Sequence, residues 1–236
     1  MKFWWWTGAY PGNFGDIVTP VILDYFGIPC EYSKDDYEAI STGSIIRKTR
    51  PGTIVLGSGA LGPTNTGHPE ADYRFVRGPL TRQHILDHGG KCPEIYGDPA
   101  MLLPLIRDSA TKKYDYGLIP HWSQYERVRA RYPKHHVVNM RTNDPLRTLD
   151  EITQCRTIAA SSLHGVIAGH AYGIPTALLE FDPLKGDGTK FLDHYLAAGI
   201  DPELSTAKHP VFSVGYIDLD PIVKIFNDLR DQIQCA

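Results

Sequence analysis

Short apolar runs alternate with stretches of helical apolar spacing along most of this 236-residue chain. The runs predict strands over residues 3–7, 53–57, 73–76, 114–119, 136–139, 156–160 and 176–181. Helical spacing occurs around residues 18–25, 125–132 and 222–233, where apolar side chains recur every three or four positions. This alternation is typical of β-α-β units, whose strands pair in parallel. The sequence therefore predicts an α/β fold.

A polar, charged segment, RDSATKK at residues 107–113, divides the predicted strands into two similar groups. We therefore expect two Rossmann-like lobes, residues 1–108 and 109–236, that face one cleft. Asp220 and Pro221 have the residue types of an N-cap and a first helical position. They predict a C-terminal helix, which we expect to pack back on the first lobe. In α/β sheets ligands bind beyond the carboxyl ends of the strands, so the loops after the strands are the candidate site.

Composition excludes several classes of protein. A net charge of −3 is too mild for a protein that binds nucleic acid. The four cysteines lie far apart without a CxxC pair, which favours neither a disulfide framework nor a zinc site and fits a reducing cytoplasm. The sequence has no signal-peptide core and no apolar run long enough to span a membrane.

Three consecutive tryptophans, Trp4, Trp5 and Trp6, stand near the start of the chain. Such an apolar run is more often a buried first strand. The alternative is peripheral association with the inner face of a membrane, because tryptophan favours the lipid interface.

The loop GNFGD (residues 12–16) follows the first predicted strand and leads into a helix. Its glycines allow the backbone to approach a ligand, and the helix N-terminus attracts anions. Asp16 is a candidate base or acceptor for sugar hydroxyls, with Asn13 beside it. The commoner role of an aspartate at this place is to cap the helix.

Two more loops follow strands in the first half. In RGPLT (residues 77–81), Arg77 stands where a strand ends and can bind a carboxylate or phosphate through paired hydrogen bonds. Arg77 is therefore the leading candidate for an anion ligand. Gly59, in GSGALG (residues 57–62), predicts either close approach to a ligand or facing lobe, or a flexible loop. Asp98 before Pro99 has the residue pattern of a helix N-cap.

The stretch SSLHG (residues 161–165) lies between a predicted strand and a helix. The hydroxyls of Ser161 and Ser162, the helix N-terminus and the His164 imidazole together predict a pocket for phosphate or carboxylate. His164 is either a hydrogen-bond donor and proton carrier or a structural histidine, and the sequence favours the two roles equally. Lys190 stands in the first turn of a helix after a glycine-rich segment, 186–188, where the helix dipole repels a cation. That position suggests an anionic ligand.

A basic run precedes the predicted strand at 136–139. A solvated helix face is the usual explanation, and attraction of a diphosphate-bearing acceptor is the alternative. Its members are Arg127, Arg129, Arg131, Lys134, His135 and His136. The histidine spacing does not match a metal-ligand pattern.

Taken in order, GNFGD, GSGALG, RGPLT, GDPAMLL, SSLHG and KFLDHYLAAGI resemble the pattern of polysaccharide pyruvyl transferases, over residues 12 to about 200. The resemblance implies a fold similar to the two-lobed GT-B glycosyltransferases. It also implies phosphoenolpyruvate as donor, a saccharide as acceptor and a pyruvate ketal as product, in polysaccharide or exopolysaccharide biosynthesis. Nucleotide-linked, lipid-linked and polymer acceptors all remain open.

Carried over by position, the resemblance assigns residues to the two substrates. The donor side comprises Arg77, Ser161, Ser162, His164 and Lys190. The acceptor side comprises Asn13, Asp16 and Gly59. His164 is the candidate acid and Asp16 the candidate base, although the reverse assignment is also open. No cofactor or metal is expected, because arginine and lysine can neutralise the leaving phosphate.

The second position of SSLHG departs from the family, which often has arginine where this chain has Ser162. Lys190 is the expected replacement for that cation. Two other functions are compatible with these residues: a glycosyltransferase that uses a nucleotide sugar, and a non-catalytic protein that binds sugar or phosphate. The serine at position 162 favours the latter.

Overall fold

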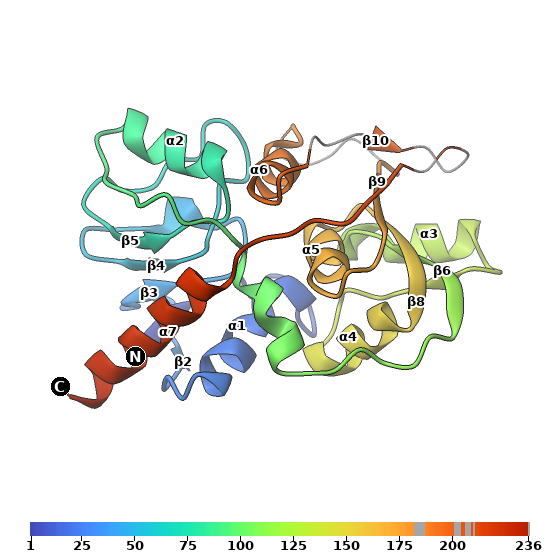
Figure 1. Ribbon diagram of the computed structural model, residues 1–236, viewed down its shortest axis with the longest axis horizontal. Coiled ribbons are helices and arrows are strands. Elements are labelled where there is room, and N and C mark those ends of the chain that lie inside the picture. The colour runs from blue at the N-terminus through green and yellow to red at the C-terminus, as the bar shows by residue number, and fades with distance from the viewer. Residues whose placement is uncertain (182–186, 201–203, 206–208, 210, 236) are drawn as a thin grey trace.

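A computed structural model describes residues 1–181, 187–200, 204–205, 209 and 211–235. The first sheet is wholly parallel, with strand order β2-β1-β3-β4-β5 (Figure 1). Its strands are β1 (Lys2–Trp4), β2 (Glu31–Tyr32), β3 (Ala39–Ile40), β4 (Ile54–Leu56) and β5 (Asp72–Phe75).

The second sheet has the order β10-β9-β8-β6-β7, again parallel, and β11 adds an antiparallel pair to β9. Its strands are β6 (Tyr114–Ile119), β7 (His136–Val137), β8 (Cys155–Ala160), β9 (Thr176–Leu179), β10 (Leu204–Ser205) and β11 (Phe212–Ser213). The parallel sheets confirm the predicted α/β class.

Both sheets have the same parallel strand order. Numbered along the chain within each sheet, the parallel strands follow the order 2-1-3-4-5, one of the common doubly wound orders. The direction of winding therefore reverses between β1 and β3 in the first sheet, and between β6 and β8 in the second. Such a reversal opens a crevice beyond the carboxyl ends of the two strands, where α/β proteins bind ligands.

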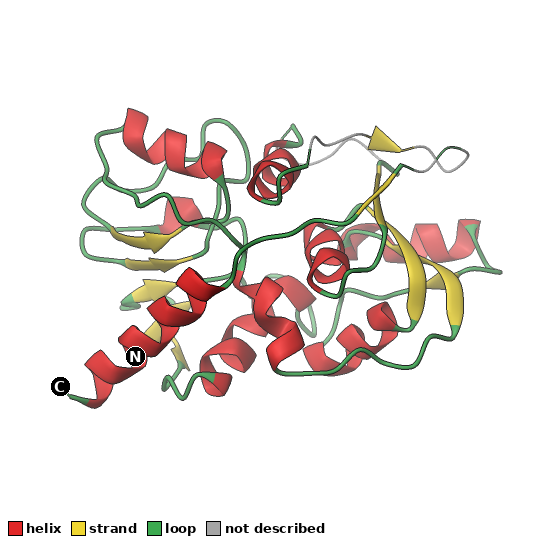
Figure 2. Cartoon of the chain, viewed as in Figure 1, coloured by secondary structure: helices red, strands yellow, loops and turns green. Residues whose placement is uncertain are grey.

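Helices cover the sheets and fill the space between them, as Figure 2 shows. They are α1 (Phe14–Tyr25), α2 (Pro79–Asp87), α3 (Tyr125–Arg131), α4 (Pro145–Thr153), α5 (Leu163–Ala171), α6 (Thr189–Ala197) and α7 (Asp220–Gln234). Short 3-10 turns are η1 (Ile46–Lys48), η2 (Pro99–Leu105) and η3 (Trp122–Gln124). Because α1, η2 and α5 lie between the sheets, one continuous apolar core extends through both lobes (Figure 1).

The long helices form where apolar spacing predicts them. In α1, Val18 and Ile22 are buried, but Tyr25, predicted on the same face, is 48% exposed at the helix end. In α4, the Asp144 side chain accepts a hydrogen bond from the Arg147 N–H and caps the helix. The sequence reading missed α4, as well as β2 and β3, which are only two residues long.

The C-terminal helix α7 returns to the first lobe after the chain crosses from β11 (Figure 1). Its Phe226 ring is fully buried and stacks on Phe26 at 4.8 Å and edge-on to Phe75 at 5.9 Å, measured between ring centroids. Burying a side chain of this size contributes about 1.5–3 kcal/mol. The expected packing of this helix is confirmed, although Asp220 is its first residue rather than its N-cap.

The two sheets take their strands from residues 2–75 and 114–213. This arrangement is compatible with lobes of residues 1–108 and 109–236, whose boundary stays a prediction, as does the likeness to GT-B enzymes. Within the described residues, no helix combines the length and apolar character needed to cross a membrane.

Candidate active site

A cleft of about 280 Å³ lies where the two winding reversals face each other. The first lobe contributes residues that follow β1, β3 and β4, and the second contributes residues that follow β6 and β8 together with the first turn of α6. Its lining comprises Trp4, Trp6, Asn13, Asp16, Gly43, Ser44, Ile45, Arg47, Leu61, His121, Trp122, Ser162, Leu163, His164 and Lys190. Five of the residues selected from the sequence therefore line it: Asn13, Asp16, Ser162, His164 and Lys190.

A histidine and a carboxylate meet at the floor of this cleft. His164, in the first turn of α5, is 8% exposed, and its Nε2 lies 3.5 Å from Oδ2 of the fully buried Asp98. Burial by itself raises the pKa of Asp98, but His164 and the Ala100 N–H outweigh it and hold that pKa below its usual value. Asp98 therefore remains ionised, and its carboxylate faces the His164 imidazole, which it can orient.

Asp98 also caps η2, as the sequence predicts, because its side chain accepts a hydrogen bond of 3.0 Å from the Ala100 N–H. The capping signal is local. The contact of Asp98 with His164 depends on packing between residues 66 positions apart, so it could not be predicted from the sequence.

The absence of a side chain at Gly15 leaves space for the His164 ring. A Cβ atom built on Gly15 would stand 1.8 Å from Nδ1 of His164, so only glycine leaves room for the imidazole against the first turn of α1. The glycine in GNFGD thus accommodates a side chain of the facing lobe.

Asp16 lies in the first turn of α1 and is 6% exposed. Burial raises its pKa to about 6, although a hydrogen bond of 2.6 Å from the Asn13 side chain and the nearby His164 act in the opposite direction. The residue at the N-cap position is Asn13, so capping is not the role of Asp16. A carboxyl group that titrates near neutral pH can accept and release protons during a reaction.

Arg77, the leading anion ligand from the sequence, is not among the residues that line the cleft. Its side chain is fully buried, and its Nε and Nη2 lie 3.1 and 3.0 Å from Oδ2 of Asp193, which is also fully buried. Its remaining contacts are hydrogen bonds from Nη1 to Ser44 Oγ and from Nη2 to the Ala60 carbonyl. Arg77 therefore connects α6 of the second lobe to the cleft wall at Ser44.

The rest of RGPLT completes this junction. Asp193 accepts hydrogen bonds from the Thr81 N–H at 3.0 Å and the Thr81 hydroxyl at 2.7 Å. A Cβ at Gly78 would stand 2.0 Å from the Asp193 carbonyl oxygen, so the glycine lets α6 approach the start of α2. The RGPLT motif thus forms the contact between the start of α2 and α6.

Gly59 and Ser161 likewise lie behind the cleft rather than on it. A Cβ at Gly59 would stand 2.3 Å from the Arg77 guanidinium carbon, so Gly59 makes room for that side chain. Ser161 donates a hydrogen bond of 2.6 Å to Gln124 and accepts one from the His121 N–H, which holds the η3 turn. Ser162 lines the cleft and caps α5 through a hydrogen bond from the Gly165 N–H.

Two cations reach the cleft from opposite lobes. Lys190 stands in the first turn of α6 and is 7% exposed, with Nζ 5.1 Å from the Phe191 ring centroid. Part of the glycine-rich segment before it, including Gly186, lies outside the described residues. Arg47, on η1, is exposed and forms no ion pair within the described part of the chain. The sequence reading missed Arg47, because the strand before it, β3, is two residues long and carries no periodicity that would mark the loop after it.

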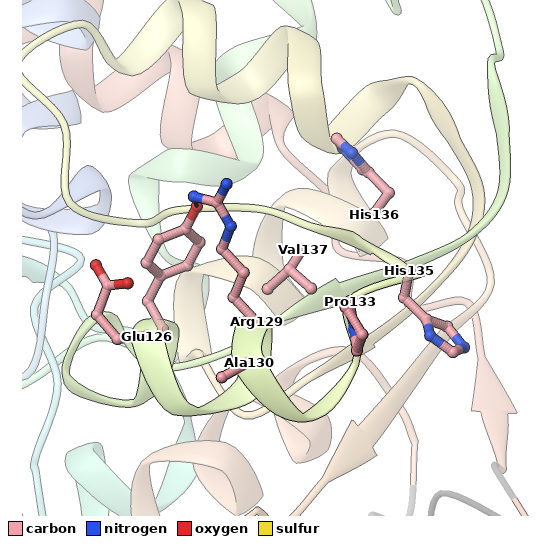
Figure 3. A pocket seen from close by; sticks show the side chains of 8 residues that line it. Glu126, Arg129, Ala130, Pro133, His135, His136 and Val137 are labelled. Atoms are coloured by element: carbon pink, nitrogen blue, oxygen red, sulfur yellow. Dashed lines mark hydrogen bonds between the residues drawn. The ribbon is translucent and has the colours of Figure 1, made fainter.

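Three residues of the basic run, Arg129, His135 and His136, line another hollow of about 680 Å³ between α3 and β7 (Figure 3). Arg129 donates a hydrogen bond of 3.1 Å to the Tyr125 hydroxyl, and Glu126 pairs with Arg141 at 3.0 Å. The His136 ring stacks on Tyr114 with centroids 3.9 Å apart. Arg129 and His136 thus contact other side chains of the protein. The hollow shares no lining residue with the cleft. Attraction of a diphosphate to this run stays a prediction.

The structure is thus an α/β protein of two mainly parallel sheets. Its cleft holds His164, which faces the buried Asp98, the carboxyl group of Asp16, and the basic side chains of Arg47 and Lys190. The family model of polysaccharide pyruvyl transferase matches residues 33–183, and the chain belongs to this family.

Two relatives extend the comparison. The chain is 29% identical over 170 residues to the uncharacterized protein L143 of Acanthamoeba polyphaga mimivirus, covering 67% of this chain and 59% of the relative. It is 26% identical over 190 residues to the succinoglycan biosynthesis protein ExoV of Rhizobium meliloti (strain 1021), covering 74% of this chain and 58% of the relative. The aligned region thus spans under two thirds of either relative.

Proposed function

We propose that this protein transfers the pyruvyl group of phosphoenolpyruvate to two hydroxyls of a saccharide, which forms a pyruvate ketal. The family implies pyruvyl transfer and a saccharide acceptor. The observation that carries the proposal for this chain is the meeting of the His164–Asp98 pair with Asp16 at one cleft. The reaction needs an acid and a base, and these groups can supply both.

The anionic donor binds between Arg47 and Lys190, whose charges match its carboxylate and phosphate groups. The N-termini of α1 and α5 also end at the cleft and favour negative charge there. Lys190 remains the proposed replacement for the arginine that the family often has at position 162, and Arg47 adds a second positive charge from the first sheet's side of the cleft. In this scheme Arg77 supports the cleft wall from behind, since Asp193 neutralises its charge.

Protonated His164, stabilised by Asp98, gives its proton to the methylene carbon of phosphoenolpyruvate. The central carbon gains cationic character, and the first acceptor hydroxyl bonds to it as Asp16 accepts the hydroxyl proton. The carbon–oxygen bond to phosphate then breaks, and inorganic phosphate leaves. The proton held by Asp16 passes to the leaving phosphate. The second hydroxyl bonds to the same carbon and gives its proton to His164, which closes the ketal, restores the acid and leaves the former methylene as a methyl group.

The test is to incubate the protein with phosphoenolpyruvate and a panel of pyranosides and to measure acceptor-dependent phosphate release, with the ketal identified by mass. The Asp16→Asn and His164→Asn variants should lose most of the turnover while remaining folded. Turnover of a nucleotide sugar, with no phosphate release for any acceptor, would instead show a glycosyltransferase. Saccharide binding without binding or reaction of phosphoenolpyruvate would show a non-catalytic protein.

A further inference from the structure

Each lobe places a tryptophan on the cleft directly after its first strand. Trp6 follows β1 and Trp122 follows β6, and these strands occupy the same place in their sheets. The two ring systems meet across the lobes with centroids 5.6 Å apart and planes inclined by 37°. Both side chains remain partly exposed. Neither indole has a role in the proton transfers or in the binding of the anionic donor.

The Trp6 ring packs against the backbone at Gly8. A Cβ built on Gly8 would stand 2.3 Å from the Trp6 ring, so the chain folds back beneath that ring only because residue 8 is glycine. Trp5, by contrast, packs on Tyr32 with centroids 4.9 Å apart and is not among the cleft residues. The tryptophan run is therefore divided: Trp4 and Trp6 line the cleft, and Trp5 lies away from it.

We infer that Trp6 and Trp122 form a subsite for one pyranose ring of the acceptor, an assignment that rests on the proposed function. A pyranose presents C–H groups on its face and hydroxyls around its edge, so it needs an apolar wall beside hydrogen-bonding groups. Indole rings provide a large rigid apolar surface with one N–H donor. Asn13 and Ser44 on the same cleft provide polar partners for hydroxyls.

The subsite requires both lobes, because one ring comes from each. An acceptor held there lies in the cleft that also contains Asp16, the proposed base. A nucleobase could also stack on indoles, and that occupant is an outcome of the test below.

The experiment compares Trp6→Ala and Trp122→Ala with Trp5→Ala, a matched change in the same tryptophan run. With the pyranoside that supports turnover, we expect the first two variants to raise the acceptor KM at least tenfold and the donor KM less than twofold. Trp5→Ala should change neither. An unchanged acceptor KM, or an equal rise in both KM values, would overturn the assignment.

Binding separates this inference from the proposed reaction. If the wild-type protein releases no phosphate from phosphoenolpyruvate, titration with the same pyranosides, measured by isothermal titration calorimetry, still tests the subsite. Saturable binding that Trp6→Ala and Trp122→Ala abolish supports it. Binding of free nucleotides but no pyranoside refutes it. Should an alanine variant fail to fold, Trp6→Phe should retain most acceptor binding and Trp122→Leu should lose it.

Discussion

The buried pair of Arg77 and Asp193 gives the sharpest quantitative test of the fold. Asp193→Asn removes the negative charge from a site where neither side chain is exposed and leaves the guanidinium without its ion-pair partner. Removing one partner of a buried pair costs about 3–5 kcal/mol, because the other charge stays desolvated. For a chain of this length 1 kcal/mol lowers Tm by about 2–4 °C, so we expect a decrease of about 6–20 °C.

The assay is thermal and urea unfolding followed by circular dichroism. The control is Asp115→Asn, the same chemical change at the exposed pair of Arg156 and Asp115, whose side chains are 62% and 96% exposed. Exposed pairs contribute about 0–1 kcal/mol, so the control should barely move Tm. If Asp193→Asn behaves like the control, the pair is not desolvated and the interface between α6 and the first lobe is not as described.

The same variants separate the two roles considered for Arg77. If Arg77 supports the cleft from behind, Asp193→Asn and Arg77→Met should each weaken donor saturation, and the double variant should add little to either. Residues that act as one unit show such non-additivity. If Arg77 instead binds the donor directly, only Arg77→Met should raise the donor KM, with Asp193→Asn close to wild type. That result would support the sequence-based prediction that Arg77 binds the donor.

Three further outcomes follow from the cleft. Gly15→Ala should displace the His164 ring and lower kcat about 100-fold, the scale of a lost general acid; near-normal kcat would show that the ring position is not needed. Asn13→Ala removes a hydrogen bond that lowers the pKa of Asp16, so the rising limb of the pH–rate profile should move upward from about pH 6; an unmoved limb would exclude Asp16 as the base. Burial raises the pKa of Asp16 from 3.8 to about 6 in the folded chain, so the folded state holds this proton more tightly than the unfolded state. The resulting stabilisation of the fold is complete below pH 3.8 and is lost as the pH rises through 6. Asp16→Asn should therefore increase the free energy of unfolding at pH 8, by up to about 3 kcal/mol, with the gain shrinking toward pH 4; no gain at pH 8 in urea unfolding would contradict the burial argument.

Local signals in the sequence were sufficient for the fold class and for part of the cleft. Alternation of apolar runs with helical spacing predicted parallel α/β sheets, because each periodicity reflects the element in which it occurs. The rule that ligands lie beyond the carboxyl ends of strands selected Asn13, Asp16, Ser162 and His164, all of which line the cleft. Very short strands such as β3 were missed, since two residues carry no periodicity.

The role of Arg77 as a ligand stays a prediction, and its contacts show what the sequence could not reveal. Its place after a strand was read correctly, but its partner Asp193 lies 116 residues away in the other lobe. The His164–Asp98 contact and the meeting of Trp6 with Trp122 have the same origin. The sequence by itself determined the α/β class, most of the longer elements and the loops that follow their strands, because those signals span one turn or strand. Only the tertiary structure decided which side chains lie on the cleft and which behind it, because packing between the lobes sets desolvation and partners.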